Sequence, residues 1–328
     1  MPPLPTPPSR FSRYQSTSVL PFLNVSDELI VLRFASFGQR VHYASLPAKS
    51  AQVALQHSGR AEPRLPVWSG PESRGTELRG VLMRVAVLAD IHGHLPALEA
   101  VLDEIHAAAV DTIVLNGDIA TGPMPAETLD RLAQLGDKAI WVRGNADREL
   151  VAAYDGALSP DLAETVRAPT EYCASRLESR HRDLLADLPL SIAIDVTGQG
   201  PVRFCHATTR SDTEIVLVDS PIERYRDAFI DTAESTVVLG HTHMPFDRLA
   251  DRRRFVNPGS VGMPYGARAA LWALLGPDVV LRRTVYDADV AAETLRSAAP
   301  EYPGLDEFID ENVLTVPSDA QALAVFSR

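Results

Sequence analysis

Val85-Ala-Val-Leu-Ala-Asp90-Ile-His92-Gly-His94 is the stretch of the sequence that decides the fold. Its five apolar residues predict a buried strand, and the glycine marks the turn that follows. Residues two apart in an extended segment point the same way, so Asp90 and His92 can converge on one metal ion at the carboxyl end of this strand. Taken alone, the pair also fits a helix cap followed by a surface histidine.

The same arrangement recurs along the chain. Four further apolar segments each end in a side chain that can bind a metal, namely Asp118, Asn145, His206, and His241 with His243. Four of the nine histidines in the chain fall at these five strand ends. Because open sheets carry their ligands at the carboxyl ends of strands, the series predicts a metal site and outweighs the surface interpretation.

The intervening segments alternate between helix and strand. Helices are predicted at 95–109, 128–135, 171–188 (one helix or a pair) and 287–298. Further strands are predicted at 112–115, 139–142, 191–196, 202–205, 237–239, 269–275 and 279–286. Short connections between them predict an α/β domain over residues 83–298, with parallel strands and helices on the sheet faces. The sequence predicts no role for the acidic tail 299–328.

Residues 1–82 differ in composition from the rest of the chain. They contain ten of the 25 prolines and nine Lys or Arg against five Asp or Glu, whereas the whole chain has a formal net charge of -12. This composition predicts a disordered or loosely attached extension. A second hypothesis is that Met83 is the true initiator. A native protein whose first residue lies well before Met83 would contradict it.

The composition argues against several classes of protein. The longest apolar runs are far shorter than the roughly 20 residues that cross a membrane, and the start lacks the apolar core of a secretory signal. The acidic balance, with a pI near 5.2, argues against a broad nucleic-acid-binding face. Two cysteines, Cys173 and Cys205, are too few for a disulfide framework and predict a cytoplasmic protein. Cys205 follows Phe204 in an apolar run and is expected in the core.

The kinds of side chain at the strand ends indicate the chemistry. His241 and His243 lie one residue apart and, in an extended segment, can contact two neighbouring ions. Asp118 is the natural carboxylate to bridge these ions. Imidazole, carboxylate and amide ligands together suit Mn, the favoured ion, or Fe, Zn, Ni or Co, better than Mg or Ca. Two such ions clamp a phosphoryl oxygen and activate water, so the predicted reaction is in-line hydrolysis at phosphorus.

In their order along the chain, the motifs resemble those of the calcineurin-like metallophosphoesterases. The matching motifs are Asp90-x-His92, Gly117-Asp118, Gly144-Asn145-x-Asp147, His206 and Gly240-His241-x-His243. The compact bacterial and archaeal phosphodiesterase branch is the most similar, because of Asp90-Ile-His-Gly and the later Asn257-Pro-Gly-Ser-Val-Gly. The resemblance extends from Arg84 to about Tyr286.

The resemblance implies a fold, a ligand set and an activity. The fold is an α/β sandwich of two mixed sheets flanked by helices, in α-β-β-α order. One metal would bind Asp90, His92, Asp118 and His243, and the other would bind Asp118, Asn145, His206 and His241. Asn145 and His206 also count as catalytic residues. The implied activity is attack of a metal-bridging hydroxide on the phosphorus of a small soluble phosphate ester.

One position departs from the family pattern. Many relatives carry a histidine where Ala146 stands, and that histidine stabilises or protonates the leaving group. Alanine cannot do so, which predicts substrates with good leaving groups. Branch members that lack this histidine are similar in showing phosphodiesterase activity, and this resemblance ranks diesters above monoesters. His94 is a candidate substitute imidazole, although a solvent-facing position is the favoured interpretation. Asp147 is a candidate to orient Asn145 or to meet the substrate phosphate, and the alternative is a helix-start acid.

Three functions remain open. A dinuclear phosphodiesterase is favoured over a phosphomonoesterase or nucleotide pyrophosphohydrolase. A catalytically inactive scaffold with the same fold predicts eroded ligands, whereas all seven ligand positions carry a suitable side chain. Extended nucleic acids are not favoured as substrates. Specificity is assigned to residues 148–201 and to the loops 210–221 and 258–267, while the natural substrate, the metal and the oligomeric state are left open.

Overall fold

The computed structural model describes residues 30–33, 43–46 and 83–326. The chain divides into two compact units, Met1–Thr76 and Glu77–Arg328. In the first unit, strands β1 (Ile30–Arg33) and β2 (Tyr43–Leu46) pair in antiparallel fashion. The disorder predicted for residues 1–82 otherwise falls on residues that lie outside the described part of the chain.

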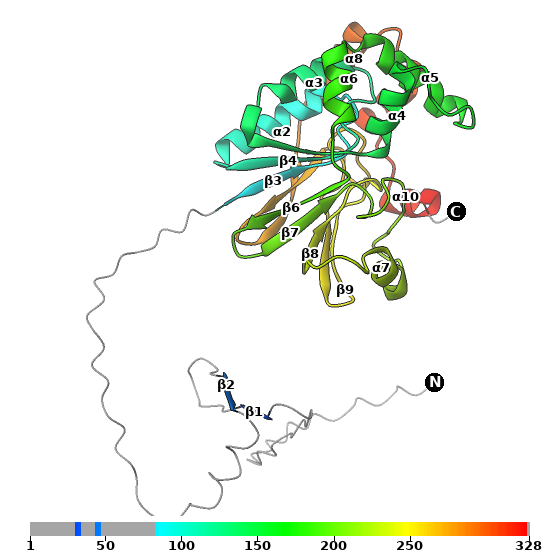
Figure 1. Cartoon of the computed structure of the whole chain (residues 1–328). Helices are drawn as coiled ribbons and strands as arrows, with labels where there is room; N and C mark the ends of the chain where they lie inside the picture. The colour runs from blue at the N-terminus through cyan, green and yellow to red at the C-terminus, as the bar shows by residue number, and fades with distance from the viewer. Residues whose placement is uncertain (1–29, 34–42, 47–82, 327–328) are drawn as a thin grey trace, which may run out of the picture. The chain divides into compact units, whose positions relative to one another are not determined.

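Two five-stranded mixed sheets lie at the centre of the second unit (Figure 1). Their strands are β3 (Val85–Leu88), β4 (Thr112–Asn116), β5 (Ala139–Val142), β6 (Ser191–Val196), β7 (Gly200–Cys205), β8 (Thr236–Val238), β9 (Phe246–Ala250), β10 (Arg253–Asn257), β11 (Ala270–Leu275) and β12 (Val279–Thr284). The strand orders are β12-β11-β3-β4-β5 and β6-β7-β8-β10-β9. The predicted sandwich of two mixed sheets is confirmed.

Within each sheet a parallel centre is extended by antiparallel strands. In the first sheet β3, β4 and β5 are parallel, as predicted, while β11 pairs in antiparallel fashion with both β3 and β12. In the second sheet β7, β8 and β10 are parallel, and β6 and β9 are antiparallel edge strands. The carboxyl ends of the five central strands β3, β4, β5, β7 and β8 are therefore available for one site.

The helices lie outside the sheets. They are α2 (Leu95–Ala107), α3 (Pro125–Ala133), α4 (Asn145–Tyr154), α5 (Glu164–Arg176), α6 (Ser179–Ala186), α7 (Ile222–Ala228), α8 (Ala288–Ala298), α9 (Leu305–Ile309) and α10 (Asp319–Phe326). Figure 1 shows α2, α3, α4 and α6 beside the first sheet and α7 beside the second. The predicted helical segment 171–188 is a pair. The elements α7, α9, α10 and β9 were not predicted, and α4 was foreseen only in the interpretation of Asp147 as a helix-start acid. In the described part of the chain, no helix combines the length and apolar character needed to cross a membrane.

The buried apolar residues form three layers. Along β3, Ala86 and Leu88 pack in the cluster beneath the helices, while Val85 and Val87 pack in the cluster between the two sheets. Both faces of this strand are buried, which explains why it reads as a continuous apolar run. A third cluster joins the second sheet to α7 and contains Cys205, so its expected place in the core is confirmed.

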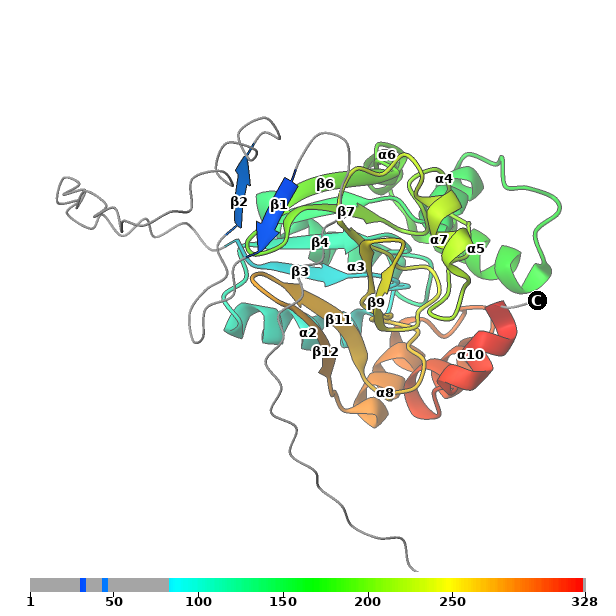
Figure 2. The same cartoon turned by 90° about the horizontal axis from the view of Figure 1, so that it is seen from below.

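The segment after α8 is part of the same folded unit. Phe308, Ile309 and Val313 are buried in the cluster beneath the helices. The backbone N–H of Gly266 donates to the carbonyl of Pro317 at 2.9 Å, which joins this segment to the loop after β10. Figures 1 and 2 both show α10 on the side of the unit toward which the arrows of β3 and β4 point. The C-terminal segment thus reaches the edge where the strand ends meet.

Candidate metal centre

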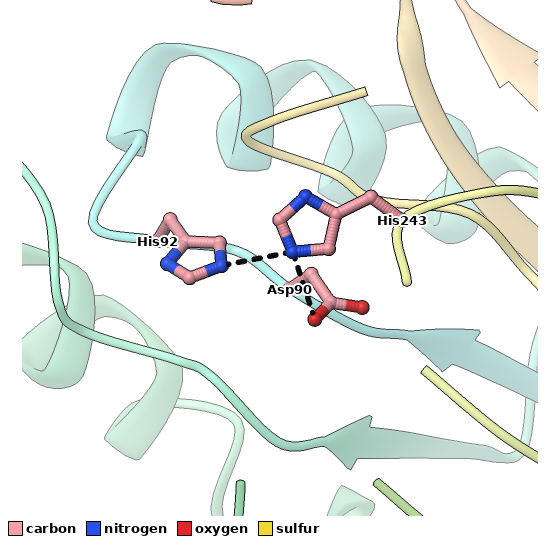
Figure 3. Close-up of side chains that lie close together, drawn as sticks. All are labelled: Asp90, His92 and His243. Atoms are coloured by element: carbon pink, nitrogen blue, oxygen red, sulfur yellow. Dashed lines mark hydrogen bonds and ion pairs between the residues drawn. The ribbon is translucent and has the colours of Figure 1, made fainter. Parts of the chain in front are cut away.

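Six of the predicted side chains form two groups at this edge. One group consists of Asp90, His92 and His243, and the other of Asp118, His206 and His241. Within each group the candidate ligand atoms all lie within 4.8 Å of one another. Figure 3 shows the imidazole of His243 lying between His92 and the carboxylate of Asp90. Residues from four strand ends, far apart in sequence, are thereby brought together.

The backbone at these positions is not extended, contrary to the prediction. Five of the six residues have positive φ angles, namely Asp90 (56°), His92 (48°), Asp118 (53°), His241 (65°) and His243 (56°). The strands stop earlier than expected, β3 at Leu88 and β8 at Val238, so the ligands lie in turns. Residues other than glycine in this region cost about 1–3 kcal/mol each, a strain that is typical of functional sites.

Hydrogen bonds between neighbouring loops hold these strained turns. The backbone N–H of Asp90 donates to the Gly117 carbonyl at 3.0 Å, and that of His92 donates to the Asp118 carbonyl at 3.0 Å. The loop after β3 therefore continues the pairing of β3 with β4 beyond the ends of the strands. The two backbones are locked to each other where they present Asp90, His92 and Asp118.

The protonation of three imidazoles follows from their hydrogen bonds. The Nδ1 atoms of His92, His206 and His243 lie 3.1, 3.0 and 2.9 Å from backbone carbonyl oxygens. A carbonyl oxygen can only accept, so each Nδ1 carries a proton, and each Nε2 is the ring nitrogen left to bind a metal. The Nε2 atoms of His92 and His243 are only 3.2 Å apart, and within the described residues His206 Nε2 has no hydrogen-bond partner.

Facing lone pairs repel each other unless a positive charge lies between them. Backbone carbonyls that hold Nδ1–H are also the usual way in which proteins orient histidine ligands toward a metal. The residues present therefore fit a divalent cation in each group.

Asp118 lies between the two groups. Its Oδ1 accepts a hydrogen bond from the backbone N–H of Ala146 at 2.8 Å. Its Oδ2 lies 3.8 Å from Nε2 of His92 and 3.4 Å from Nε2 of His206, which belong to different groups. One oxygen is thus engaged by the backbone, and the other faces both groups, as a bridging ligand requires.

Asn145 is the first residue of α4 and directly precedes Ala146, whose N–H holds Asp118. Its Oδ1 is buried and lacks a hydrogen-bond partner in the described part of the chain. A buried acceptor without a donor costs about 1–3 kcal/mol. Coordination to a cation would remove that cost, which fits the ligand role predicted for this residue.

The family follows from this site together with a comparison of sequences. Residues 83–276, more than half of the chain, match the family model described as the calcineurin-like phosphoesterase superfamily domain. The chain belongs to this superfamily. It is a phosphoesterase, and the two groups are its candidate sites for divalent metals. The predicted family and class of enzyme are confirmed.

Known relatives of this phosphoesterase include enzymes and solved structures. The phosphodiesterase YfcE of Escherichia coli is 26% identical over 224 residues, covering 65% of this chain and 97% of the relative. The structure of a metallophosphoesterase from Sphaerobacter thermophilus has a TM-score of 0.56 and 26% identity, over 70% of this chain and 98% of that one. A symmetrical bis(5'-nucleosyl)-tetraphosphatase of Paracidovorax citrulli is 36% identical over 107 residues, covering 32% of this chain and 36% of the relative.

The charges in the phosphoesterase site are strongly coupled. Burial lowers the pKa of His206, but the carboxylates of Asp118 and Asp90 outweigh burial and raise this pKa to about 10. Burial and the nearby charge of His206 lower the pKa of His241 to about 4. Although burial opposes it, the charge of His206 holds the pKa of Asp118 well below its usual range. A proton on His206 thus supplies positive charge that bound cations would replace.

Asp147 lies beneath the site and is not a member of either group. Its carboxylate is buried and accepts hydrogen bonds from the backbone N–H groups of Asp118, Ile119 and Gly144, each at 2.9 Å. It is the third residue of α4, and its bond to Gly144 closes the start of that helix. The side chain ties the loop after β4 to the loop after β5, which agrees with the interpretation as a helix-start acid.

His94 is buried, so the expectation that it faces solvent was wrong. Its Nδ1 accepts the backbone N–H of Ala97 at 3.1 Å and caps α2, and its Nε2 lies 3.4 Å from the hydroxyl of Tyr286. Burial lowers the pKa of His94 to about 4, which keeps the ring neutral, so Nδ1 accepts from Ala97 and Nε2 carries the proton toward Tyr286. Neither metal group includes it, and both of its ring nitrogens have partners elsewhere.

Two aromatic side chains beside the metal groups were missed in the sequence. The ring centroid of Tyr265 is 6.0 Å from that of His243, and the ring centroid of Phe326 is 6.4 Å from that of His241. Tyr265 lies in the loop 258–267, to which specificity was assigned without any individual residue. Phe326 is the last residue of α10, in the tail that was given no role, and no motif distinguishes it.

Proposed function

We propose that the chain is a phosphodiesterase that uses two divalent transition-metal ions, with Mn favoured, on small soluble phosphate esters. The observation that carries this proposal is the arrangement of Asp118, whose free oxygen faces the Nε2 atoms of His92 and His206, one from each group. When bound, two such ions polarise the phosphoryl group and lower the pKa of a water molecule enough for attack near neutral pH.

The roles of the residues follow from their surroundings. Asp90, His92 and His243 would hold one ion, and Asn145, His206 and His241 the other, with Asp118 shared between them. The hydrogen bonds from Nδ1 to backbone carbonyls fix the imidazoles before substrate arrives, so little reorganisation is needed. Asp147 would act as a positioning residue, because it contacts the backbone of Asp118 and no group that meets the substrate.

The preference for diesters is supported by Ala146. This residue precedes Asp147 at the start of α4, and its N–H is used to hold Asp118. A methyl group cannot protonate a leaving oxygen, so substrates with a good leaving group are favoured. His94 is a poor substitute, since its two ring nitrogens already have partners. The relative named as a phosphodiesterase is consistent with this preference.

The alternative of a nucleotide pyrophosphohydrolase has one specific observation in its favour. The tetraphosphatase relative is 36% identical over 107 residues, but this stretch covers only 32% of the chain and 36% of the relative. The inactive-scaffold alternative is disfavoured, because the ligand set is complete and two groups of ligands assemble. A cytoplasmic location is supported only by the buried, unpaired state of Cys173 and Cys205.

The test combines metal analysis with activity profiling. Protein stripped with a chelator is titrated with Mn²⁺, and hydrolysis of bis(p-nitrophenyl) phosphate is compared with that of p-nitrophenyl phosphate. We expect two bound ions per chain, metal-restored activity and a higher kcat/KM for the diester. Asp118→Asn should lower the diester rate by about 10²-fold or more, while Asp103→Asn, at an exposed carboxylate, should leave it unchanged. Equal or higher efficiency on the monoester would reject the diesterase assignment.

A further inference from the structure

We propose that Tyr265 and Phe326 form an aromatic wall of the active site that stacks on a flat ring carried by the substrate ester. The C-terminal helix α10 would then be a specificity element. This inference rests on the proposed phosphodiesterase function and adds to it the chemical class of the group esterified to phosphate, a nucleoside or another aryl group.

The first observation is the geometry of the rings. The ring centroids of Tyr265 and Phe326 are 6.3 Å apart, and the two planes meet at 90°. Each ring also neighbours a different metal group, Tyr265 beside His243 and Phe326 beside His241. Edge-to-face pairs at this separation are favourable, so the two rings hold each other in place. A substrate whose phosphorus lies over the metal groups would have its ester groups within reach of this wall.

The second observation is how firmly the wall is held. The backbone N–H of Gly266, next to Tyr265, donates to the Pro317 carbonyl at 2.9 Å, so the loop and the C-terminal segment are joined. The segment that leads to α10 is anchored in the core by Phe308, Ile309 and other buried residues. Rings that are held before binding lose little conformational freedom when a substrate stacks on them.

The third observation is a depression of which Phe326 forms part of the lining. It has a volume of about 600 Å³ and is lined by Ile215, Leu217, Pro221, Arg224 and Phe326, among others. This volume is within the usual range of small-ligand pockets. Arg224 donates to the Ile215 carbonyl through Nε at 3.1 Å and Nη2 at 3.0 Å, which fixes the loop opposite Phe326.

The lining of this depression combines one aromatic ring, Phe326, with aliphatic and polar side chains. Ile215, Leu217 and Pro221 offer apolar contact, while Arg224 and Asp219 provide polar groups at the rim. Base–aromatic stacking accepts any base, because every base has a π face. We therefore assign recognition to the ring as such and not to a particular base.

The experiment measures binding of product-like ligands to the Mn²⁺-loaded chain by calorimetry. The ligands are adenosine 5'-monophosphate, phenyl phosphate and ribose 5-phosphate, which carry a nucleobase, a small aryl ring and no aromatic ring. Phe326→Ala should weaken adenosine monophosphate binding by about 5- to 100-fold, the range typical of base–aromatic stacking, and ribose 5-phosphate binding by less than twofold. Binding of phenyl phosphate as tight as that of the nucleotide would assign the wall to aryl rings in general, and weaker binding would assign it to nucleobases.

Matched variants separate stacking from folding. Phe326→Leu keeps an apolar side chain at the end of α10 and should recover only part of the binding, and Tyr265→Ala should resemble Phe326→Ala. Val325→Ala changes the neighbouring residue, which is 56% exposed, and should have no effect. Unaltered ribose 5-phosphate binding in each variant shows that the phosphate site is intact.

Two results would overturn the inference. One is an equal loss of affinity for all three ligands in Phe326→Ala, which would mean that the side chain has only a structural role. The other is tighter binding or a higher kcat/KM in Phe326→Ala, which would mean that the ring obstructs the site. Wild-type chain that binds these ligands with the expected order and yet hydrolyses no diester would instead refute the proposed function.

Discussion

Replacing Asp147 by asparagine tests whether one buried carboxylate holds the metal site together. The native side chain receives three N–H groups on two oxygens, Oδ2 from Asp118 and Gly144 and Oδ1 from Ile119. Asparagine has a single acceptor oxygen. In its better orientation the amide keeps the two bonds to Oδ2 and turns its NH₂ toward the N–H of Ile119, where two donors face each other.

The magnitude can be worked from these bonds. One buried N–H without an acceptor costs about 1–3 kcal/mol, and the two bonds that remain lose their charge-assisted part, about 1 kcal/mol each. Some of this is recovered, because burial and the charge of Asp118 raise the pKa of Asp147 to about 6, so the buried charge is itself unfavourable. We expect Asp147→Asn to lower the free energy of unfolding by about 2–4 kcal/mol.

The same change should weaken metal binding, because Asp147 positions the backbone that presents Asp118. Outer residues of this kind are typically worth 10- to 100-fold in metal affinity. Guanidinium unfolding of the metal-free chain and calorimetric titration with Mn²⁺ measure the two effects. Asp103→Asn, at an exposed carboxylate, is the matched control. An Asp147→Asn protein with unfolding free energy within about 0.5 kcal/mol and Mn²⁺ affinity within twofold of the wild type would refute the reasoning.

Three further perturbations probe the site. Ala146→His should raise turnover of phenyl phosphate, whose leaving group is poor, by about 10- to 100-fold by supplying a proton donor, and Ala146→Gln should not; equal rates would remove the leaving-group argument. Gly117→Ala should weaken Mn²⁺ binding and lower the melting temperature, because the added Cβ would lie 2.5 Å from Nδ1 of His206 and residue 117 has a φ of 88°. A variant with the melting temperature and the Mn²⁺ affinity of the wild type would contradict this. Mn²⁺ affinity should increase about tenfold per pH unit between pH 6 and 8, because the ion displaces the proton of His206, whose pKa is about 10. An affinity independent of pH would show that no proton is released.

The sequence by itself determined the class of fold and the chemical content of the site. A strand buried on both faces must be apolar throughout, and this is why Val85–Leu88 could be recognised. The ligands follow such strands directly, so residue type and order sufficed to name Asp90, His92, Asp118 and the paired histidines. These are local properties, since each depends only on a residue and its neighbours in the chain.

The tertiary structure alone decided the partners of each side chain. His94 and Asp147 stand in the same motifs as the ligands, yet one caps a helix and the other binds three backbone N–H groups. The positive φ angles of the ligands likewise arise from contacts between loops, which no single segment contains.

Phe326 is the clearest case of a residue whose place only the fold reveals. It lies more than eighty positions after His241, in a tail without a motif, and reaches the metal groups because Phe308, Ile309 and Val313 anchor that tail in the core. A contact between distant segments depends on how every intervening element packs. Local sequence patterns therefore reveal a strand and the residues at its end, but not which distant segments come into contact.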